Sequence, residues 1–516
     1  MTSGHGKKDK PYVGDYGEPI EGVGRIASAS VSLVVLACLI GFAVGVVVWG
    51  ALTLSNLLIH LLWHELPAAL PFEAPWLPLA LCPLGGLIIG LWTRTFHNAP
   101  ESLDAVMETV RATGGYRLKG LGSSIVSFLL PLTFGGSVGP EAGLTGIIAA
   151  ACTWIGNTLK RAGLKVKAVA DLTLSATLSA VFGAPLLGIV LNAEEQERGH
   201  TRARGQDQEQ ECAREQGQER ARTQDRARAQ GRDGERARER GRARAQERDG
   251  ECAQKRGASA ASPSPSDYTF RRPAKLLLYT AAAFGAFGGA VLVGSLLGGS
   301  AGLPRFSSIG ASGLEYAWTV PLALAGWLLG LLFHGSSRLF RAASRKFKND
   351  SLAPPLLVGV VMGALATALP GVLFSGEEQC FAIMENWALS SAFVLLLTGV
   401  FKVALTSLCL NFGWRGGNFF PCIFAGVSFG YGASALLGVD PMLCVTSVTT
   451  ALIACMTRKP LLSLALLLLC FPADGLLVSG IAAIMGAALP VPRALQTARK
   501  ADESRPAAGA SLQESD

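Results

Sequence analysis

The chain has 516 residues, of which 50% are hydrophobic and only 16% are charged, with 61 glycines. Apolar runs of membrane-spanning length recur, which excludes an ordinary soluble enzyme and predicts an all-α polytopic membrane protein. The formal net charge is +8, and residues 197–256 hold 17 Lys/Arg and 13 Asp/Glu. The rest of the positive excess is spread thinly, so no compact basic domain indicates a nucleic-acid partner.

The 11 cysteines stand mostly singly within apolar runs, without a CxxC or His-rich spacing. They indicate neither a disulfide framework nor a zinc site, and we expect no metal and no cofactor. There is no nucleophile motif, and the only paired acids we single out are Glu194-Glu195 and Glu377-Glu378. We expect the second pair in a solvated polar loop, and therefore expect no enzyme and no catalytic residues.

The apolar runs form two halves around a charged insert. The predicted segments are a polar tail at 1–26, a first membrane half at 27–195, an insert at 196–272, a second half at 273–499 and a polar tail at 500–516. The insert is rich in Arg, Glu and Gln and has almost no apolar residues, which predicts a disordered loop. Its arginine excess favours the cytoplasmic side for the insert and the N-terminus. The first tail lacks a signal-peptide cleavage pattern, so we expect the first run to remain a membrane helix.

In chain order, the expected apolar membrane elements are 27–62, 79–92, 119–134, 140–159, 168–181, 185–193, 276–297, 317–333, 355–369, 392–411, 422–437, 441–455, 460–470 and 476–489. An amphipathic helix is predicted from about residue 98 to Thr113, with His97 or Asn98 as its cap. A short polar helix is predicted near 375–386. The basic segments 161–167 and 338–348 are expected as cytoplasmic connections.

Two of these elements begin at matched glycine-rich breaks, at residues 135–140 (GGSVGP) and 416–421 (GGNFFP). The proline of each motif suits the first turn of a helix. The glycines have no side chains, so their backbone amides stay accessible to a ligand. A helix start at membrane depth offers N–H groups and the positive end of the helix dipole, which predicts an anion site. The alternative is a simple glycine hinge between two spanning helices.

Each break is followed by a further Pro-Leu-Leu helix start, at Pro185 and Pro460. Two ordered pairs of interrupted helices indicate a midplane site in an inverted-repeat transporter. The predicted anion-binding residues are His97, Asn98, Gly136, Ser137, Val138, Gly139, Gly417, Asn418, Phe419 and Phe420. Lys402 is a charge inside an apolar run and so a functional candidate. We favour the alternative for it, pairing with a buried carboxylate or snorkelling to an interface.

These motifs resemble the chloride-channel (ClC) family of anion channels and proton-coupled anion exchangers. Residues 136–140 are similar to the family's Gly-Lys/Arg-Glu-Gly-Pro, and residues 417–421 are similar to its Gly-x-Phe-x-Pro. Residues 182–188 (FGAPLLG), which run on to Glu194-Glu195, add to the resemblance. It covers the chain from Ala27 to about Arg499, less the insert.

The resemblance implies an inverted repeat of many tilted and broken transmembrane helices. It also implies a homodimer in the lipids of the cell membrane, with one pore in each subunit. Chloride or another small anion would lie between converging helix N-termini. We expect no nucleotide-sensing domain after Asp516, by resemblance to the shorter bacterial members of the family.

The departures from the family pattern are as informative as the matches. Val138 stands at the family's gating glutamate, and valine can neither titrate nor imitate an anion. His97 stands where the family has an anion-coordinating serine; it could donate a hydrogen bond to the ion or merely cap its helix. Glu195 matches the internal proton-transfer glutamate of the exchangers. The tyrosine at the inner end of the family's pore has no counterpart, because Pro490 and Pro492 occupy that region.

Two further side chains near the breaks have open roles. Asn418 could direct its amide to the ion path or hold its own helix cap. Glu141 lies in the first turn after the break, where a carboxylate suits the helix dipole. It could replace the missing gate, although three residues after Val138 we expect it to face another direction.

Three hypotheses follow. The first, motivated by Val138, is passive, uncoupled movement of an anion, with chloride as the default. The second is a proton-coupled or fluoride-type transporter with Glu195, Glu141 or His97 as the relay. The third is a non-conducting sensor or scaffold that acts through the insert. The passive hypothesis requires the helix breaks to converge without a carboxylate reaching across the gap between them.

Overall fold

The computed structural model describes residues 21–69, 75–96, 120–160, 176–177, 179–182, 272–298, 304–347, 351–468 and 470–492. Its α-helices are α1 (Glu21–His60), α2 (Leu66–Ala68), α3 (Leu77–Phe96), α5 (Leu121–Thr133), α6 (Glu141–Lys160), α10 (Arg272–Leu297), α11 (Thr319–Ser344), α12 (Ala353–Ala368), α13 (Glu377–Asn386), α14 (Ala392–Asn411), α15 (Phe419–Leu437), α16 (Pro441–Thr457), α17 (Pro460–Leu467) and α18 (Leu476–Ala488). Short 3₁₀ or π turns flank several of them. Both polar tails up to residue 20 and from 493, and the insert up to residue 271, lie outside the described residues.

Among the described residues, six helices are long and apolar enough to cross a membrane: Val34–Ala68, Leu77–Phe96, Thr280–Leu297, Glu315–Ser344, Ala392–Asn411 and Phe419–Leu437. Shorter apolar helices, which include α5, α12, α16 and α18, lie between them. This arrangement confirms the prediction of an all-α polytopic membrane protein of tilted and broken helices. Several of the long helices are covered on one side only. They carry many exposed leucines, as expected for side chains that face lipid.

Local sequence explains several helix ends. The Asp440 carboxylate accepts a hydrogen bond from the Leu443 amide (2.8 Å) and so caps α16, which has Pro441 at its first position. The helix ends at Arg458, which takes a left-handed conformation with φ 58°. Gly438 ends α15 in the same way, with φ 68°, where a glycine is free of strain.

Some predicted boundaries and environments were wrong. The basic segment 338–348 is not a separate connection, because α11 continues to Ser344. α15 begins at Phe419 rather than Cys422, since Pro421 fits within the first turn. Glu377 is buried at the start of α13 instead of lying in a solvated loop.

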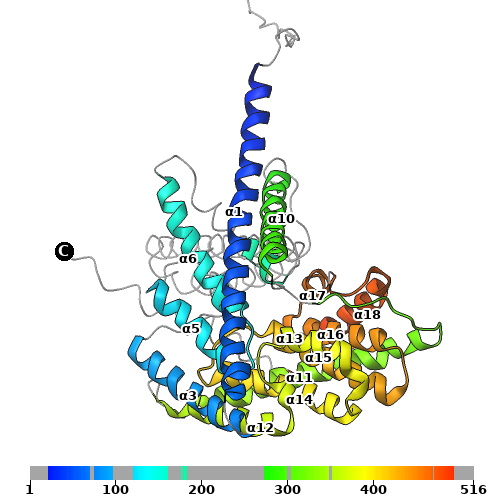
Figure 1. The fold of residues 1–516 in the computed structure, drawn as a ribbon. Helices are drawn as coiled ribbons and strands as arrows, with labels where there is room; N and C mark the ends of the chain where they lie inside the picture. The colour runs from blue at the N-terminus through cyan, green and yellow to red at the C-terminus, as the bar shows by residue number, and fades with distance from the viewer. Residues whose placement is uncertain are drawn as a thin grey trace, which may run out of the picture.

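The helices of the two halves pack against each other through small residues. α10 lies along α1 (Figure 1), and Gly41 and Gly45 of α1 meet the backbone of α10 at Ala282 and Ala286. α3 and α12 form a second such pair. Helices in lipid associate through close backbone approach at glycine and alanine, because the hydrophobic effect does not drive their association there.

A single methyl group should therefore test the contact between α1 and α10. We expect Gly45→Ala to lower the free energy of unfolding by about 1–3 kcal/mol, because its Cβ would overlap with the Ala286 carbonyl. Gly50→Ala, in the same helix, meets no atom within 4 Å and should be neutral or slightly stabilising. Thermal unfolding in detergent compares the two variants, and equal shifts would contradict the packing described.

Candidate functional site

The two glycine-rich breaks lie side by side although they are far apart in the sequence. Gly139 and Gly417 form an isolated antiparallel bridge. The Gly139 amide donates to the Gly417 carbonyl (2.8 Å), and the Gly417 amide donates to the Gly139 carbonyl (2.7 Å). This double hydrogen bond brings the start of α6 next to the start of α15, one from each half of the chain.

The turn before α6 depends on glycine at one position. Gly135 has φ 84°, a left-handed conformation that favours glycine. Its carbonyl accepts a hydrogen bond from the Phe374 amide (3.0 Å), which ties the turn to the link between α12 and α13. The break is therefore fixed by contacts from the second half and is more than a flexible hinge.

Glu141 extends from the first turn of α6 to the start of α15. Its Oε1 accepts a hydrogen bond from the Phe419 amide (2.7 Å), and the Phe420 amide lies beside the same carboxylate. The side chain is only 1% exposed, and its Oε2 has no hydrogen-bond partner among the described residues. A carboxylate thus occupies the N-terminal amides of α15, the position where a helix binds an anion.

Glycine on both sides makes room for this carboxylate. At Gly139 and at Gly417, the three atoms nearest to an added Cβ all belong to the Glu141 carboxyl group. Any larger residue at either position would overlap with it. The two glycines of the bridge therefore serve a second purpose, which is to hold the Glu141 side chain between the two helix starts.

The other predicted donors are engaged within the protein. The amides of Gly136 and Val138 donate to the carbonyls of Pro131 (2.7 Å) and Gly136 (2.8 Å). The Thr406 hydroxyl donates to the Lys402 carbonyl (2.8 Å), so at the 3.0 Å contact between Thr406 and Ser137 the Ser137 hydroxyl must be the donor. By contrast, the Phe419 and Phe420 amides at the start of α15 face the Glu141 carboxylate, which is an anionic acceptor.

The position of Val138 differs from that of a gating residue, and the Asn418 side chain does not act as a helix cap. The Val138 side chain is fully buried against Gly416, so it fills space beside the break. Asn418 makes no side-chain hydrogen bond to its own helix, and its amide nitrogen lies 3.9 Å from the Met456 sulfur of α16. The capping alternative for Asn418 was wrong.

Three phenylalanines surround the start of α15. Phe182 stacks on Phe420 with ring centroids 5.0 Å apart and meets Phe419 edge-on at 5.7 Å. Phe420 is fully buried, while Phe419 is partly exposed. The aromatic wall excludes water from the carboxylate side of the site, which strengthens electrostatic contacts there.

The favoured interpretation of Lys402 was also wrong. Its side chain is fully buried, so it does not snorkel, and its ammonium group binds main-chain carbonyls rather than a carboxylate. Thr406, which holds Ser137, was missed in the sequence. The only available signal was its position one helical turn after Lys402.

Several predicted residues lie outside the described residues. These are His97, Asn98, Glu195 and the helix start at Pro185. Their roles, and the third convergent helix start near Asn98, stay predictions. Among the residues that are described, no group of three His, Cys, Asp or Glu side chains could hold a metal ion.

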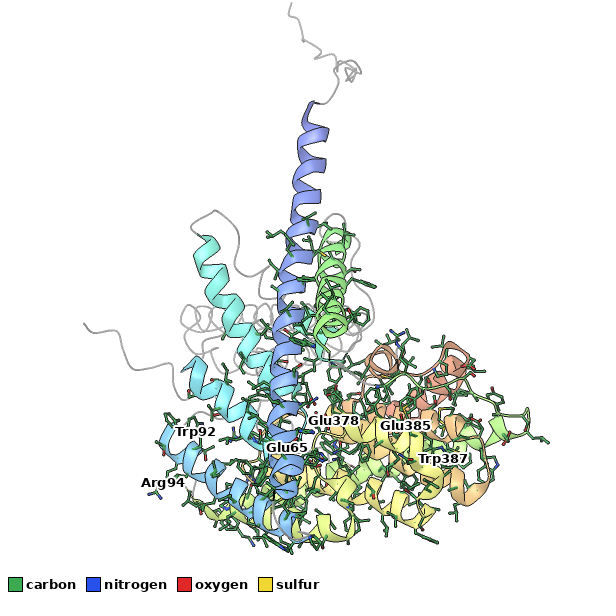
Figure 2. The ribbon with its side chains drawn as sticks, viewed as in Figure 1. Glu65, Trp92, Arg94, Glu378, Glu385 and Trp387 are labelled. Atoms are coloured by element: carbon green, nitrogen blue, oxygen red, sulfur yellow. The ribbon has the colours of Figure 1, made fainter. Side chains whose placement is uncertain are left out.

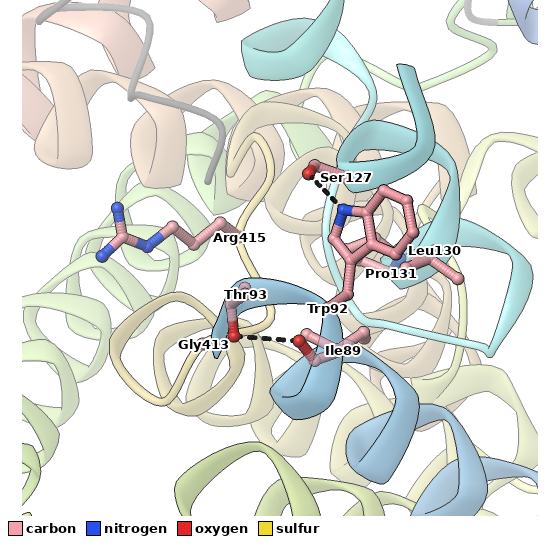
Figure 3. A pocket seen from close by; sticks show the side chains of 8 residues that line it. All are labelled: Ile89, Trp92, Thr93, Ser127, Leu130, Pro131, Gly413 and Arg415. Atoms are coloured by element: carbon pink, nitrogen blue, oxygen red, sulfur yellow. Dashed lines mark hydrogen bonds between the residues drawn. The ribbon is translucent and has the colours of Figure 1, made fainter. Parts of the chain in front are cut away.

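A shallow cleft lies behind the second break, between α3, α5 and residues 413–415 (Figure 3). The indole nitrogen of Trp92 donates to the Ser127 hydroxyl (3.0 Å), and the Thr93 hydroxyl donates to the Ile89 carbonyl (2.9 Å). Arg415 extends away from these side chains in Figure 3. The Trp92 and Ser127 side chains thus bind each other across this cleft, which lies next to the residues that lead into the second break.

Comparisons with known proteins agree with this architecture. A family model described as "Voltage gated chloride channel" matches residues 85–204 and 268–490. A CLC-type fluoride/proton antiporter aligns with a TM-score of 0.60 at 15% identity, over 90% of this chain and 96% of that one. A slow cyanobacterial Cl⁻/H⁺ antiporter aligns with a TM-score of 0.57 at 15% identity, over 90% and 99%.

A eukaryotic CLC transporter aligns less closely, with a TM-score of 0.52 at 15% identity, over 90% of this chain and 72% of that one. At this level of identity, the three structures bear on the fold alone. No match was found among the curated proteins.

Proposed function

Because the chain belongs to the voltage-gated chloride channel family, we propose that it carries a small anion across the cell membrane between the starts of α6 and α15. Chloride is the default ion and fluoride the second choice. The proposal includes a homodimer with one pathway in each subunit. It also places the N-terminus and the insert on the cytoplasmic side.

The observation that carries the proposal is the hydrogen bond from the Phe419 amide to the Glu141 carboxylate. A helix start that holds a carboxylate can hold another anion in its place, because both accept from the same N–H groups. Glu141 must then leave the Phe419 amide whenever an anion binds there. The transported ion and the Glu141 side chain compete for one position.

This competition supports the proton-coupled hypothesis over passive flow. Val138 alone favoured an open conduit, but Glu141 reaches across the gap that such a conduit needs to keep free of carboxylate. Protonation removes the negative charge of Glu141 and weakens its hold on the Phe419 amide. Glu195 and His97 stay candidates for the rest of the proton route, and the scaffold hypothesis gains nothing from the Glu141 contact.

Reconstitution in liposomes tests the proposal. We expect chloride or fluoride to move down its gradient, faster at lower pH because protonated Glu141 releases the Phe419 amide. We also expect an anion gradient to drive proton movement, recorded as pH on both sides. Anion movement without pH dependence or proton flux would support the passive hypothesis in place of the proton-coupled one. If no anion moves at all, the hypothesis of a non-conducting scaffold is favoured. Deletion of residues 196–272 then tests whether function depends on the insert.

A further inference from the structure

Lys402 is a buried cation near the middle of α14. It is 0% exposed, and its Nζ donates to the carbonyls of Phe374 (2.8 Å) and Val372 (3.1 Å), with those of Leu373 and Gly371 also in reach. Its Nζ also lies 5.2 Å from the centre of the Phe424 ring in α15. Carbonyl dipoles and an aromatic face both interact favourably with a positive charge.

Among the described residues, the hydrogen-bond partners of the Lys402 ammonium are main-chain carbonyls and include no carboxylate. Arg94, in contrast, is exposed at the end of α3 (Figure 2). A buried charge without a counter-ion is costly in a membrane, so its retention in the core calls for an explanation.

Lys402 is connected to the first break on two sides. The carbonyls that it holds belong to the link 371–374, and the Phe374 amide of that link donates to the Gly135 carbonyl (3.0 Å). Thr406, one turn further along α14, contacts the Ser137 hydroxyl at 3.0 Å. The same face of α14 thus lies directly behind residues 135–137.

Lys402 also shares a neighbour with Glu141. Both side chains contact the beginning of α15: the Lys402 ammonium faces the Phe424 ring, and the Glu141 carboxylate accepts from the Phe419 amide. An anion that displaces Glu141 would enter the field of the same cation. In a water-excluded interior such a field is weakly screened.

We propose that Lys402 is a residue that determines anion affinity: its positive charge behind the first break is the counter-charge of the anion bound at the start of α15. This inference rests on the proposed function. Lys402 acts through its field and through the link 371–374, without touching the ion. Its hydrogen bonds to the carbonyls of Val372 and Phe374 hold this link, whose Phe374 amide in turn binds the Gly135 carbonyl.

The test compares Lys402→Met, which removes the charge, with Lys402→Arg, which keeps it. Lys346→Met is the matched control, because it removes one positive charge from an exposed turn at the end of α11. Chloride binding is measured by titration calorimetry of the purified full chain in detergent, with gluconate as the background anion. Half-saturating chloride is measured separately from flux in liposomes.

We expect Lys402→Met to weaken chloride binding about tenfold or more and to raise half-saturating chloride to the same extent. Lys402→Arg should restore most of the affinity, and Lys346→Met should match the unmodified chain. If Lys402 were only structural, both Lys402 variants would yield less folded protein, yet the folded fraction would bind chloride normally. That result would overturn the inference. If the unmodified chain binds no anion, the proposed function fails instead.

Discussion

Replacement of Glu141 by glutamine should increase anion flux about tenfold or more and remove most of its pH dependence. Glutamine keeps the length of the side chain and can still accept from the Phe419 amide, but without a charge. Hydrogen bonds to charged groups contribute about 1.5–3 kcal/mol and those between neutral groups about 1 kcal/mol, so the competitor of the anion is weakened substantially. Flux in liposomes at several pH values, with proton movement recorded, measures both effects.

The matched control is Glu378→Gln, which neutralises an exposed carboxylate at the start of α13. It should leave both flux and pH dependence unchanged. Faster flux in the Glu141 variant together with a loss of proton coupling would mean that one side chain, Glu141, both competes with the anion and carries the proton. If Glu141→Gln retained the flux and the pH profile of the unmodified chain, the carboxylate would be a structural contact and another group would have to be sought.

The relation between Val138 and Glu141 explains why passive flow was the first hypothesis. Val138 and Glu141 are three residues apart, and the backbone turns into a helix between them, so their side chains cannot occupy the same place. The Val138 side chain packs behind the break, at Gly416, while the Glu141 side chain crosses to Phe419. A carboxylate in the first turn of α6 can therefore reach the amides at the start of α15 although position 138 carries a valine.

Much of the fold could be predicted from the sequence. Apolar runs set the long helices, and the predicted bounds of α14, residues 392–411, agree with the structure at both ends. The two breaks were also recognisable, because Gly-Gly-x-x-x-Pro is local chemistry that needs no partner to be identified. Where charged residues follow an apolar run, the prediction ended the helix too early, as in α11, since the helix extends beyond the apolar stretch.

The contacts that define the site could not be predicted in this way. The bond between Glu141 and Phe419 joins residues that are 278 positions apart, which the bridge between Gly139 and Gly417 helps to bring together. The ligands of Lys402 are main-chain carbonyls, which every residue carries and which therefore leave no signal in the sequence. The sequence pattern therefore could not identify these carbonyls as the partners of Lys402.

The bridge itself should be the most sensitive point of the molecule. We expect Gly417→Ala to destabilise the protein by about 1–3 kcal/mol, or to expel the Glu141 side chain, because the added methyl group would overlap with the Glu141 carboxyl group. The conformation of Gly417 is not left-handed, so alanine adds no backbone strain of its own. Thermal unfolding and the yield of monodisperse protein in detergent measure the effect.

A second variant separates the clash from a general loss of packing. Since the three atoms nearest to the new methyl group all belong to Glu141, Gly417→Ala should cost little in a chain that already carries Glu141→Ala. The two substitutions should therefore be strongly non-additive, as expected for residues in direct contact. Gly480→Ala in α18, where the added Cβ meets no atom within 4 Å, is the control and should be additive with Glu141→Ala. Equal damage from Gly417→Ala in both backgrounds would mean that Glu141 does not lie between the two helix starts.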